Sequence, residues 1–117
     1  MLMTHVLAEL YDCLDVIEDE NALAAAARTA AESVGATVIG EYEVRYVPHG
    51  LTVALFLAES HIVLTTWPEY RLTLLDVLLC NPTMDYNSVV AGIKKRICPD
   101  GTMIEHKVSR RIAEIGL

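Results

Sequence analysis

The chain has 117 residues, enough for a single domain spanning residues 1–117. Apolar residues make up 53% and charged residues 21% of it, a balance that excludes a disordered chain. The net charge of -7 argues against nucleic acid as a partner, because phosphate backbones attract basic surfaces, and it suits a cationic small molecule.

Simple patterns predict the first elements of the chain. Residues 6–11 form an apolar run that fits either a strand or a helix. A helix follows, which Asp19 or Asn21 can cap and which Gly35 is placed to end. Within it, residues at helical spacing face the core, and the many alanines allow close packing on a sheet: Leu23, Ala27, Ala30 and Val34.

The middle of the chain is rich in strand-forming residues. Pro48-His49-Gly50 is a turn that joins two strands into a hairpin, and Pro68 ends a later strand because it cannot donate a backbone hydrogen bond. The predicted strands are residues 37–47, 51–57, 61–66 and 71–80. In the last of them, alternation places these side chains on one face: Leu72, Leu74, Asp76, Leu78 and Cys80.

A second helix and a final strand complete the predicted fold. Residues 86–97 have apolar side chains at helical spacing, and basic residues near their end suit the helix dipole. A turn at Pro99 precedes the last strand, residues 102–108. Hairpin-spaced strands with two helices indicate an α+β fold, a two-layer sandwich in which both helices cover one face of a mainly antiparallel sheet.

Cysteine content and hydropathy bear on location and assembly. Cys13, Cys80 and Cys98 are odd in number and form no CxxC pair, which argues against a disulfide scaffold or a metal site and for the cytoplasm. We expect no secretory signal and no membrane segment, since apolar runs stay far below the roughly 20 residues of a membrane helix. The mean hydropathy of +0.35 is high for so small a domain, so we expect a homodimer that buries apolar surface.

Residues 57–70 carry the most specific motif. Glu59-Ser60-His61 is a polar triplet within apolar sequence, and Trp67-Pro68-Glu69 follows it. This stretch resembles the ESHxxxHTWPE motif of the prokaryotic S-adenosylmethionine decarboxylase proenzyme family, pyruvoyl-dependent enzymes of spermidine synthesis. The resemblance extends in the same order over nearly the whole chain, through residues 9–13, 35–37, 48–52 and 76–80.

The resemblance implies that the chain makes its own cofactor. The Ser60 hydroxyl would attack the Glu59 carbonyl carbon, the ester would eliminate the Glu59 carboxylate, and hydrolysis would leave a pyruvoyl group derived from Ser60. The products would be a β chain, residues 1–59, and an α chain, residues 60–117. The pyruvoyl carbonyl would form a Schiff base with a substrate amine and take up the electrons left by CO2. Cys80 would reprotonate the carbanion, which suits a thiol with a reference pKa of about 8.5.

The resemblance also implies binding roles for residues outside the triplet. Thr52 holds a Ser or Thr position near the processing centre, Tyr46 an aromatic position that can stack on adenine, and Glu9 lines the site. Trp67 and Glu69 match the motif, and the Glu69 carboxylate could accept hydrogen bonds from ribose hydroxyls. For Trp67 and Tyr46 a plain packing role stays open.

Two departures from the family pattern fall in the site. Thr65 stands where the family has a histidine credited with moving protons during self-cleavage, and His61, on the same strand face, is its nearest substitute. In the hairpin, the family pattern His-x-Phe-x-Pro reads Val44-Arg-Tyr46-Val-Pro48 here.

Three functions therefore stay open from the sequence. The chain is an S-adenosylmethionine decarboxylase, a decarboxylase of the same lineage that acts on ornithine or arginine, or a homologue that neither cleaves itself nor catalyses. All of these substrates are cationic amino-acid-type molecules, so the acidic composition does not separate them.

Overall fold

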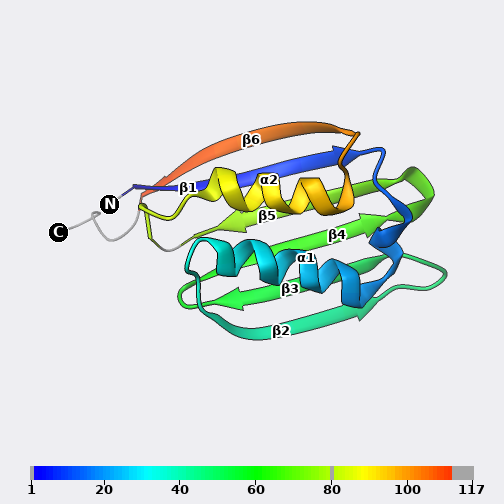
Figure 1. The fold of residues 1–117 in the computed structure, drawn as a ribbon, viewed down its shortest axis with the longest axis horizontal. Helices are drawn as coiled ribbons and strands as arrows, with labels where there is room; N and C mark the ends of the chain where they lie inside the picture. The colour runs from blue at the N-terminus through cyan, green and yellow to red at the C-terminus, as the bar shows by residue number, and fades with distance from the viewer. Residues whose placement is uncertain (1, 80, 112–117) are drawn as a thin grey trace.

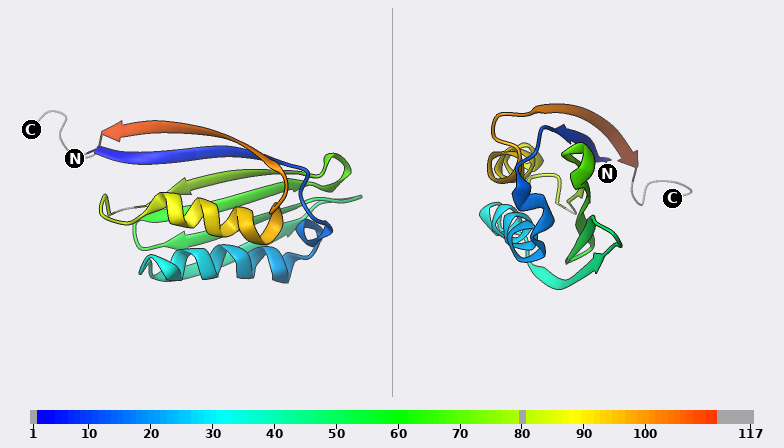
Figure 2. Two further views of the ribbon diagram at one scale, coloured as in Figure 1. Left: turned by 45° about the horizontal axis from the view of Figure 1, so that its top comes forward. Right: turned by 90° about the vertical axis from the view of Figure 1, so that its right-hand side faces the viewer.

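The computed structural model describes residues 2–79 and 81–111 (Figure 1). In these residues, six strands form one sheet in the order β2-β3-β4-β5-β1-β6, with every neighbouring pair antiparallel. Both α-helices lie on one face of this sheet (Figure 2), which confirms the predicted α+β sandwich. The elements are β1 (Leu2–Tyr11), η1 (Asp15–Glu18), α1 (Glu20–Ser33), β2 (Val38–Arg45), β3 (Leu51–Leu57), β4 (Ser60–Trp67), η2 (Pro68–Tyr70), β5 (Leu72–Leu78), α2 (Tyr86–Ile97) and β6 (Thr102–Arg111).

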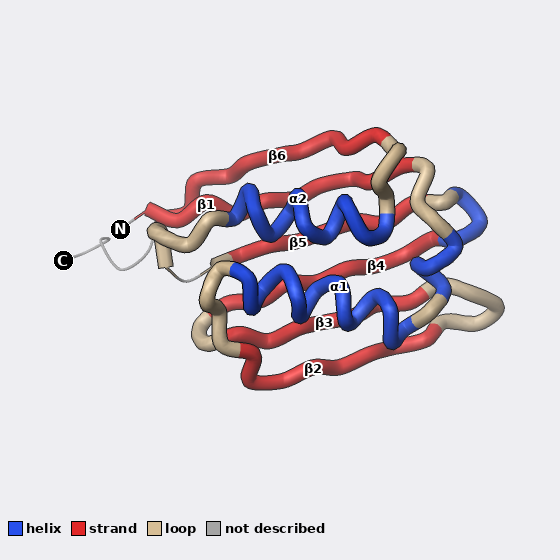
Figure 3. The backbone as a smooth tube through the Cα atoms, in the orientation of Figure 1, coloured by secondary structure: helices blue, strands red, loops and turns tan. Residues whose placement is uncertain are grey.

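The first strand, β1, lies between β5 and β6 (Figure 3). Residues 6–11, which fit a strand or a helix by sequence, belong to this strand. Val6, Ala8 and Leu10 are buried, whereas Leu7 and Glu9 are more exposed, so the two-residue alternation of a half-buried strand decides between the two structures.

Helix α1 begins and ends where the sequence predicts. The Asp19 carboxylate accepts hydrogen bonds from the backbone N–H groups of Asn21 and Ala22, at 3.0 and 3.1 Å. The helix ends at Ser33, and Gly35 follows with a left-handed φ of 80°. Its buried face is mostly alanine, which allows α1 to pack closely against α2. Within residues 2–79 and 81–111, no helix is long and apolar enough to cross a membrane.

Helix α2 repeats this pattern with a larger apolar face. Asp85 caps it, accepting hydrogen bonds from the backbone and the hydroxyl of Ser88 at 3.2 and 2.8 Å, and these bonds lower the pKa of Asp85. The buried residues of α2 are Val89, Val90, Ile93 and Ile97, as the helical spacing predicts.

The sheet has a covered face, which packs on α1 and α2, and an open face on the opposite side (Figure 2). On β3, β4 and β5, every second residue points to the covered face and is buried, and burial of one such leucine or valine contributes roughly 1.5–3 kcal/mol. The hydroxyl of buried Thr66 accepts a hydrogen bond from the Leu51 N–H at 3.0 Å, so burial of this polar group costs little free energy of folding. The alternate residues of the same strands form the open face, and packing on the helices does not constrain them.

Two hairpin turns place the ends of β3. Gly50 precedes it with a φ of 104°, and a Cβ atom there would lie 2.9 Å from the Thr66 carbonyl oxygen, so only glycine fits. The interruption that the sequence predicts at residues 58–60 is a two-residue turn, Ala58 and Glu59. Ser60 already pairs with Leu57 as the first residue of β4.

Candidate active site

Five of the ten residues predicted for the site lie on the open face, whereas Ser60, opposite buried Leu57, has the parity of the covered face. Directly opposed residues of antiparallel strands point to the same face, so the register gives rows of neighbours across the sheet. Across β1, β5 and β4 these rows are His5–Leu78–His61, Leu7–Asp76–Val63 and Glu9–Leu74–Thr65, and Thr52 of β3 lies opposite Thr65.

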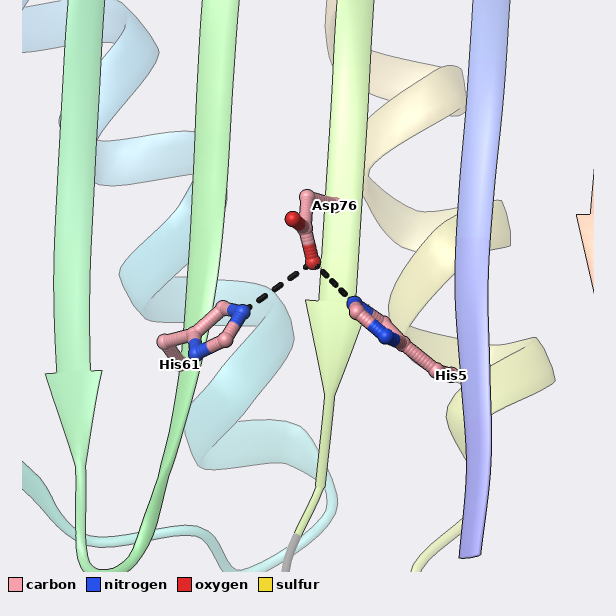
Figure 4. A group of neighbouring side chains, drawn as sticks. All are labelled: His5, His61 and Asp76. Atoms are coloured by element: carbon pink, nitrogen blue, oxygen red, sulfur yellow. Dashed lines mark hydrogen bonds and ion pairs between the residues drawn. The ribbon is translucent and has the colours of Figure 1, made fainter. Parts of the chain in front are cut away.

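One polar cluster joins three strands at the end of the sheet where β4 begins (Figure 4). The Nε2 atoms of His5 and His61 lie 2.6 and 3.1 Å from the same oxygen, Oδ1, of Asp76. The two imidazole rings meet edge to face, with centroids 5.9 Å apart. Asp76 therefore holds both rings, and His61 is fixed directly beside Ser60 in the chain.

Arg110 determines which nitrogen of His5 carries the proton. Its Nη1 atom lies 3.0 Å from Nδ1 of His5, and a guanidinium group only donates hydrogen bonds. Nδ1 therefore accepts this hydrogen bond, and the Nε2–H group donates to Asp76. The ligand atoms of His5, His61 and Asp76 lie within 4.8 Å of one another, close enough to surround a metal ion, but a metal at Nε2 of His5 would have to displace this proton. The hydrogen bonds are those of a network that positions His61.

A line of three hydroxyl groups forms the second polar group. The Tyr46 hydroxyl, just after β2, lies 2.8 Å from Oγ1 of Thr52, which lies 2.9 Å from Oγ1 of Thr65. Thr52 and Thr65 are opposite each other in the β3–β4 pair, which explains their contact. Thr65, where the chain departs from the family motif, thus ends a continuous line of hydrogen bonds.

A cavity of about 370 Å³ on the open face is bordered by both polar groups. This volume suits a small organic molecule. The carboxylates of Glu9 and Asp76 favour a cation there, and Glu9 also accepts a hydrogen bond from Nε2 of His106 at 3.0 Å. The lining residues are Leu7, Ala8, Glu9, Val63, Thr65, Leu74, Leu75 and Asp76. A cavity of about 350 Å³ between α2 and β6 contains none of the predicted site residues.

Glu59 and Ser60 occupy the turn between β3 and β4. Glu59 has a φ of 64°, in the left-handed region that non-glycine residues seldom adopt. Ser60 is partly buried. Thr65 lies five residues further along the same extended strand, about 16 Å away at the usual rise per residue. Thr65 and Ser60 of one chain are therefore too far apart for direct contact.

Three further predicted residues are not described as part of the two polar groups or of the cavity lining. Glu69 is in η2, where its Oε2 atom lies 2.6 Å from Nε2 of His49, in the loop between β2 and β3. Trp67 ends β4 on the open face, opposite Leu72, and is partly buried. Cys80, the predicted proton donor, lies outside the described residues.

Sequence reasoning missed His5 and Arg110, and it placed Asp76 on the right face without its partners. Alternation along β1 puts His5 on the same face as Glu9, so a signal was present once β1 is a strand. The contact between His5 and Asp76 joins residues 71 positions apart. It depends on the pairing of β1 with β5, which no local pattern reveals.

Fold and site together describe a small α+β enzyme domain with a cation-favouring cavity on an open sheet face. The sequence family described as S-adenosylmethionine decarboxylase matches residues 4–111, so the chain belongs to this family. An S-adenosylmethionine decarboxylase proenzyme of Thermosipho melanesiensis is 27% identical over 114 residues, covering 97% of this chain and 88% of that one. One of Synechococcus sp. WH7803 is 41% identical over 81 residues, 68% of this chain and 63% of its own. The crystal structure of the adenosylmethionine decarboxylase from Aquifex aeolicus superposes with a TM-score of 0.85 at 28% identity, covering 97% of this chain and 94% of that one.

Membership confirms the resemblance noted in the sequence. By family, the chain is a decarboxylase proenzyme, a pyruvoyl-dependent carboxy-lyase of spermidine biosynthesis. A pyruvoyl group and a small-molecule substrate follow from the family as well.

Proposed function

We propose that this chain cleaves itself between Glu59 and Ser60 and then decarboxylates S-adenosylmethionine. The observation that supports this cleavage site is the backbone conformation of Glu59. This residue directly precedes Ser60 in the tight turn and has a φ of 64°. A non-glycine residue in this region costs roughly 1–2 kcal/mol, and such strain gathers at functional sites. Cleavage of the bond after Glu59 would release that strain.

The cleavage uses groups of this protein and one water molecule. Oγ of Ser60 bonds to the Glu59 carbonyl carbon, the C–N bond breaks, and the proton lost from Oγ is balanced by one gained at the released nitrogen. The ester then loses the Ser60 α-proton and the Cβ–O bond breaks, which frees the Glu59 carboxylate and leaves dehydroalanine. Water replaces the nitrogen as ammonia departs. The products are a β chain of residues 1–59 and an α chain of residues 60–117 that begins with a pyruvoyl group.

The cavity on the open face fits a cationic substrate. The pyruvoyl carbonyl supplies the electron sink for the electrons released with CO2. His61, fixed by Asp76, lies next to it in the chain, and the carboxylates of Asp76 and Glu9 in the cavity would attract the sulfonium and amino groups of S-adenosylmethionine.

The remaining substrate and proton-transfer roles rest on the family pattern. Tyr46 and Trp67, at the end of the sheet away from Ser60 of the same chain, would contact the adenine of a substrate bound at the second copy's pyruvoyl group, and Glu69 would accept hydrogen bonds from its ribose. Cys80 would return a proton to the substrate carbon, because a thiol holds its proton near neutral pH and releases it readily.

The active form is a homodimer in which two open faces meet. This face exposes apolar side chains that a single chain leaves in water: Leu7, Phe56, Leu74, Ile104 and Val108 are 37–47% exposed. The separation of Thr65 from Ser60 also supports a dimer, because a group at position 65 can reach only the Ser60 of a second copy. Light scattering should give a dimer, and a monomer of 12.9 kDa at micromolar concentration would contradict it.

Mixed dimers test whether the site is shared. Chains carrying Ser60→Ala and differently tagged chains carrying Thr65→Val are produced together. If position 65 serves the other copy, the Thr65→Val chains should be cleaved faster in the mixture than alone. Equal rates would contradict a shared site.

We also place the protein in the cytoplasm. Among the described cysteines, Cys13 and Cys98 are buried free thiols, which suits a reducing compartment.

The function is tested by offering one purified protein three substrates. CO2 release is measured from S-adenosylmethionine, ornithine and arginine, with Ser60→Ala as the matched control that cannot form the pyruvoyl group. We expect release from S-adenosylmethionine alone. Release from ornithine or arginine would instead show a decarboxylase of the same lineage that acts on one of these amino acids. An uncleaved, inactive chain would show a non-enzymatic homologue.

A further inference from the structure

The three hydroxyls of Tyr46, Thr52 and Thr65 form one continuous line of hydrogen bonds. Their oxygen atoms are 2.8 and 2.9 Å apart, within the range of strong O–H···O hydrogen bonds. Each hydroxyl can donate one hydrogen bond and accept others, so the line can pass a proton in either direction without a change in its own protonation.

Both ends of the line are residues at which this chain departs from its family. At position 65 the family histidine is replaced by threonine, and at position 46 the family phenylalanine is replaced by tyrosine. One change removes an imidazole, and the other adds a hydroxyl group two hydrogen bonds away. Thr52, which holds a Ser or Thr position of the family, joins them.

The line also connects the cavity to the solvent. Thr65 lines the cavity together with Glu9 and Asp76, whereas Tyr46 is 46% exposed. His61, the other substitute for the missing histidine, bonds to Asp76 and shares no hydrogen bond with this line among the described residues. It lies four residues from Thr65 on β4, or about 13 Å.

We propose that Tyr46, acting through Thr52 and Thr65, replaces the missing histidine as the route for protons during self-cleavage. Tyr46 is a positioning residue in this scheme, because only Thr65 reaches the cavity. In the proposed dimer, the line of one copy takes up the proton that leaves Oγ of the other copy's Ser60 as the C–O bond forms and returns one to the released nitrogen, so atoms and charge balance over the acyl shift. This inference rests on the proposed self-cleavage and on the proposed dimer, because Thr65 and Ser60 of one chain lie about 16 Å apart.

The experiment is a cleavage time course with freshly synthesised full-length chains. The natural protein, Tyr46→Phe, Thr65→His and the double variant are labelled in cell-free translation, and two-chain formation is followed on a denaturing gel. Tyr46→Phe removes one hydroxyl and should slow cleavage about tenfold or more, since positioned proton transfer contributes roughly 10²–10⁴-fold. With Thr65→His present, Tyr46→Phe should have no effect, because the family arrangement is restored.

Matched variants separate this role from folding. Tyr42→Phe, on the exposed part of β2, loses the same hydroxyl outside the line and should cleave at the natural rate. Thr52→Val should slow cleavage as Tyr46→Phe does, whereas Thr52→Ser keeps the hydroxyl and should restore it. Thr65→His should also add a limb to the pH–rate profile near pH 6.5, the reference pKa of imidazole.

The outcomes distinguish the two proposals. If the natural chain is never cleaved, the proposed function fails and this inference falls with it. If the natural chain is cleaved and Tyr46→Phe is cleaved equally fast, self-cleavage stands and the role of Tyr46 is wrong. A strong effect of Tyr46→Phe that persists with Thr65→His would also overturn it, because the hydroxyl would then act independently of position 65.

Discussion

The covered face and the open face of the sheet are built from alternate residues of the same strands, yet they differ in kind. On β5, Thr73, Leu75 and Val77 are buried beneath the helices, while Leu74 and Asp76 point the other way. A carboxylate on the covered face would lose its water and cost several kcal/mol unless it was paired. On the open face Asp76 keeps partial contact with water and accepts from two histidines. Packing thus fixes residue type on one side of each strand and leaves the other side free for chemistry.

The largest effect is expected at Cys80, where a substitution should remove the chemistry and leave the fold intact. Cys80→Ala should leave two-chain formation intact but lower decarboxylation by roughly 10²–10⁴-fold, because the substrate carbon loses its proton donor. Chain cleavage on a gel and CO2 release report the two steps separately. Cys98→Ala is the matched control, with a modest stability cost and unchanged turnover. Undiminished CO2 release from Cys80→Ala would disprove the role.

Two adjacent leucines of β5 test the structural side directly. Leu75 is 2% exposed on the covered face and Leu74 is 38% exposed on the open face. Leu75→Ala should lower the free energy of unfolding by about 2–5 kcal/mol, the usual cost of a cavity in a core. Leu74→Ala should cost much less and should instead weaken the dimer.

Urea unfolding and light scattering at one protein concentration measure both effects. Each variant is made in the Ser60→Ala background so that every sample is a single chain. Equal losses of stability for the two leucines would show that the faces do not differ as described.

Asp76 tests whether the His5–Asp76–His61 network contributes to turnover. Hydrogen bonds to a charged group contribute about 1.5–3 kcal/mol, so Asp76→Asn should lower kcat/KM for decarboxylation by roughly ten- to a hundredfold. Glu41→Gln is a matched control, since Glu41 pairs with Arg28 away from the cavity. An unchanged kcat/KM in Asp76→Asn would make the network purely structural.

The smallest expected effect concerns the pH dependence of stability. Burial raises the pKa of the Cys13 thiol from 9.0 to about 11. The folded state therefore holds this proton more tightly than the unfolded chain, so the stabilisation is complete below pH 9 and is lost as the pH rises through 11. The loss should be about 1 kcal/mol at pH 10. Cys13→Ala should show a shallower decline between pH 9 and 11, and parallel curves for the two proteins would contradict this.

Local patterns predicted most of the fold. Asp19 and Gly35 mark the ends of α1, and the alternation in β5 placed Leu74 and Asp76 on one face, because caps and periodicity act over a few residues. The same patterns left residues 6–11 undecided. The position of β1 between β5 and β6 is set by packing between distant segments, and periodicity says which face a residue is on but not which strand lies next to it.

The site divides in the same way. The motif pointed to Glu59, Ser60 and Thr65, and the structure adds contacts that the motif does not contain. The bond between Thr52 and Thr65 depends on the β3–β4 register, and those of Asp76 depend on two further strand pairs. A sequence comparison could mark Thr65 as a departure, but only the side-chain contacts of the structure show that Thr52 links it to Tyr46.

The intact mass of the purified full-length protein tests the proposed function most directly. We predict two chains, one ending at Glu59 and one beginning with a pyruvoyl group in place of Ser60, whereas Ser60→Ala stays a single chain of nearly the same fold. A single uncleaved chain of 12.9 kDa from the natural sequence, or cleavage at another bond, would contradict the assignment of Glu59 and Ser60 as the processing site.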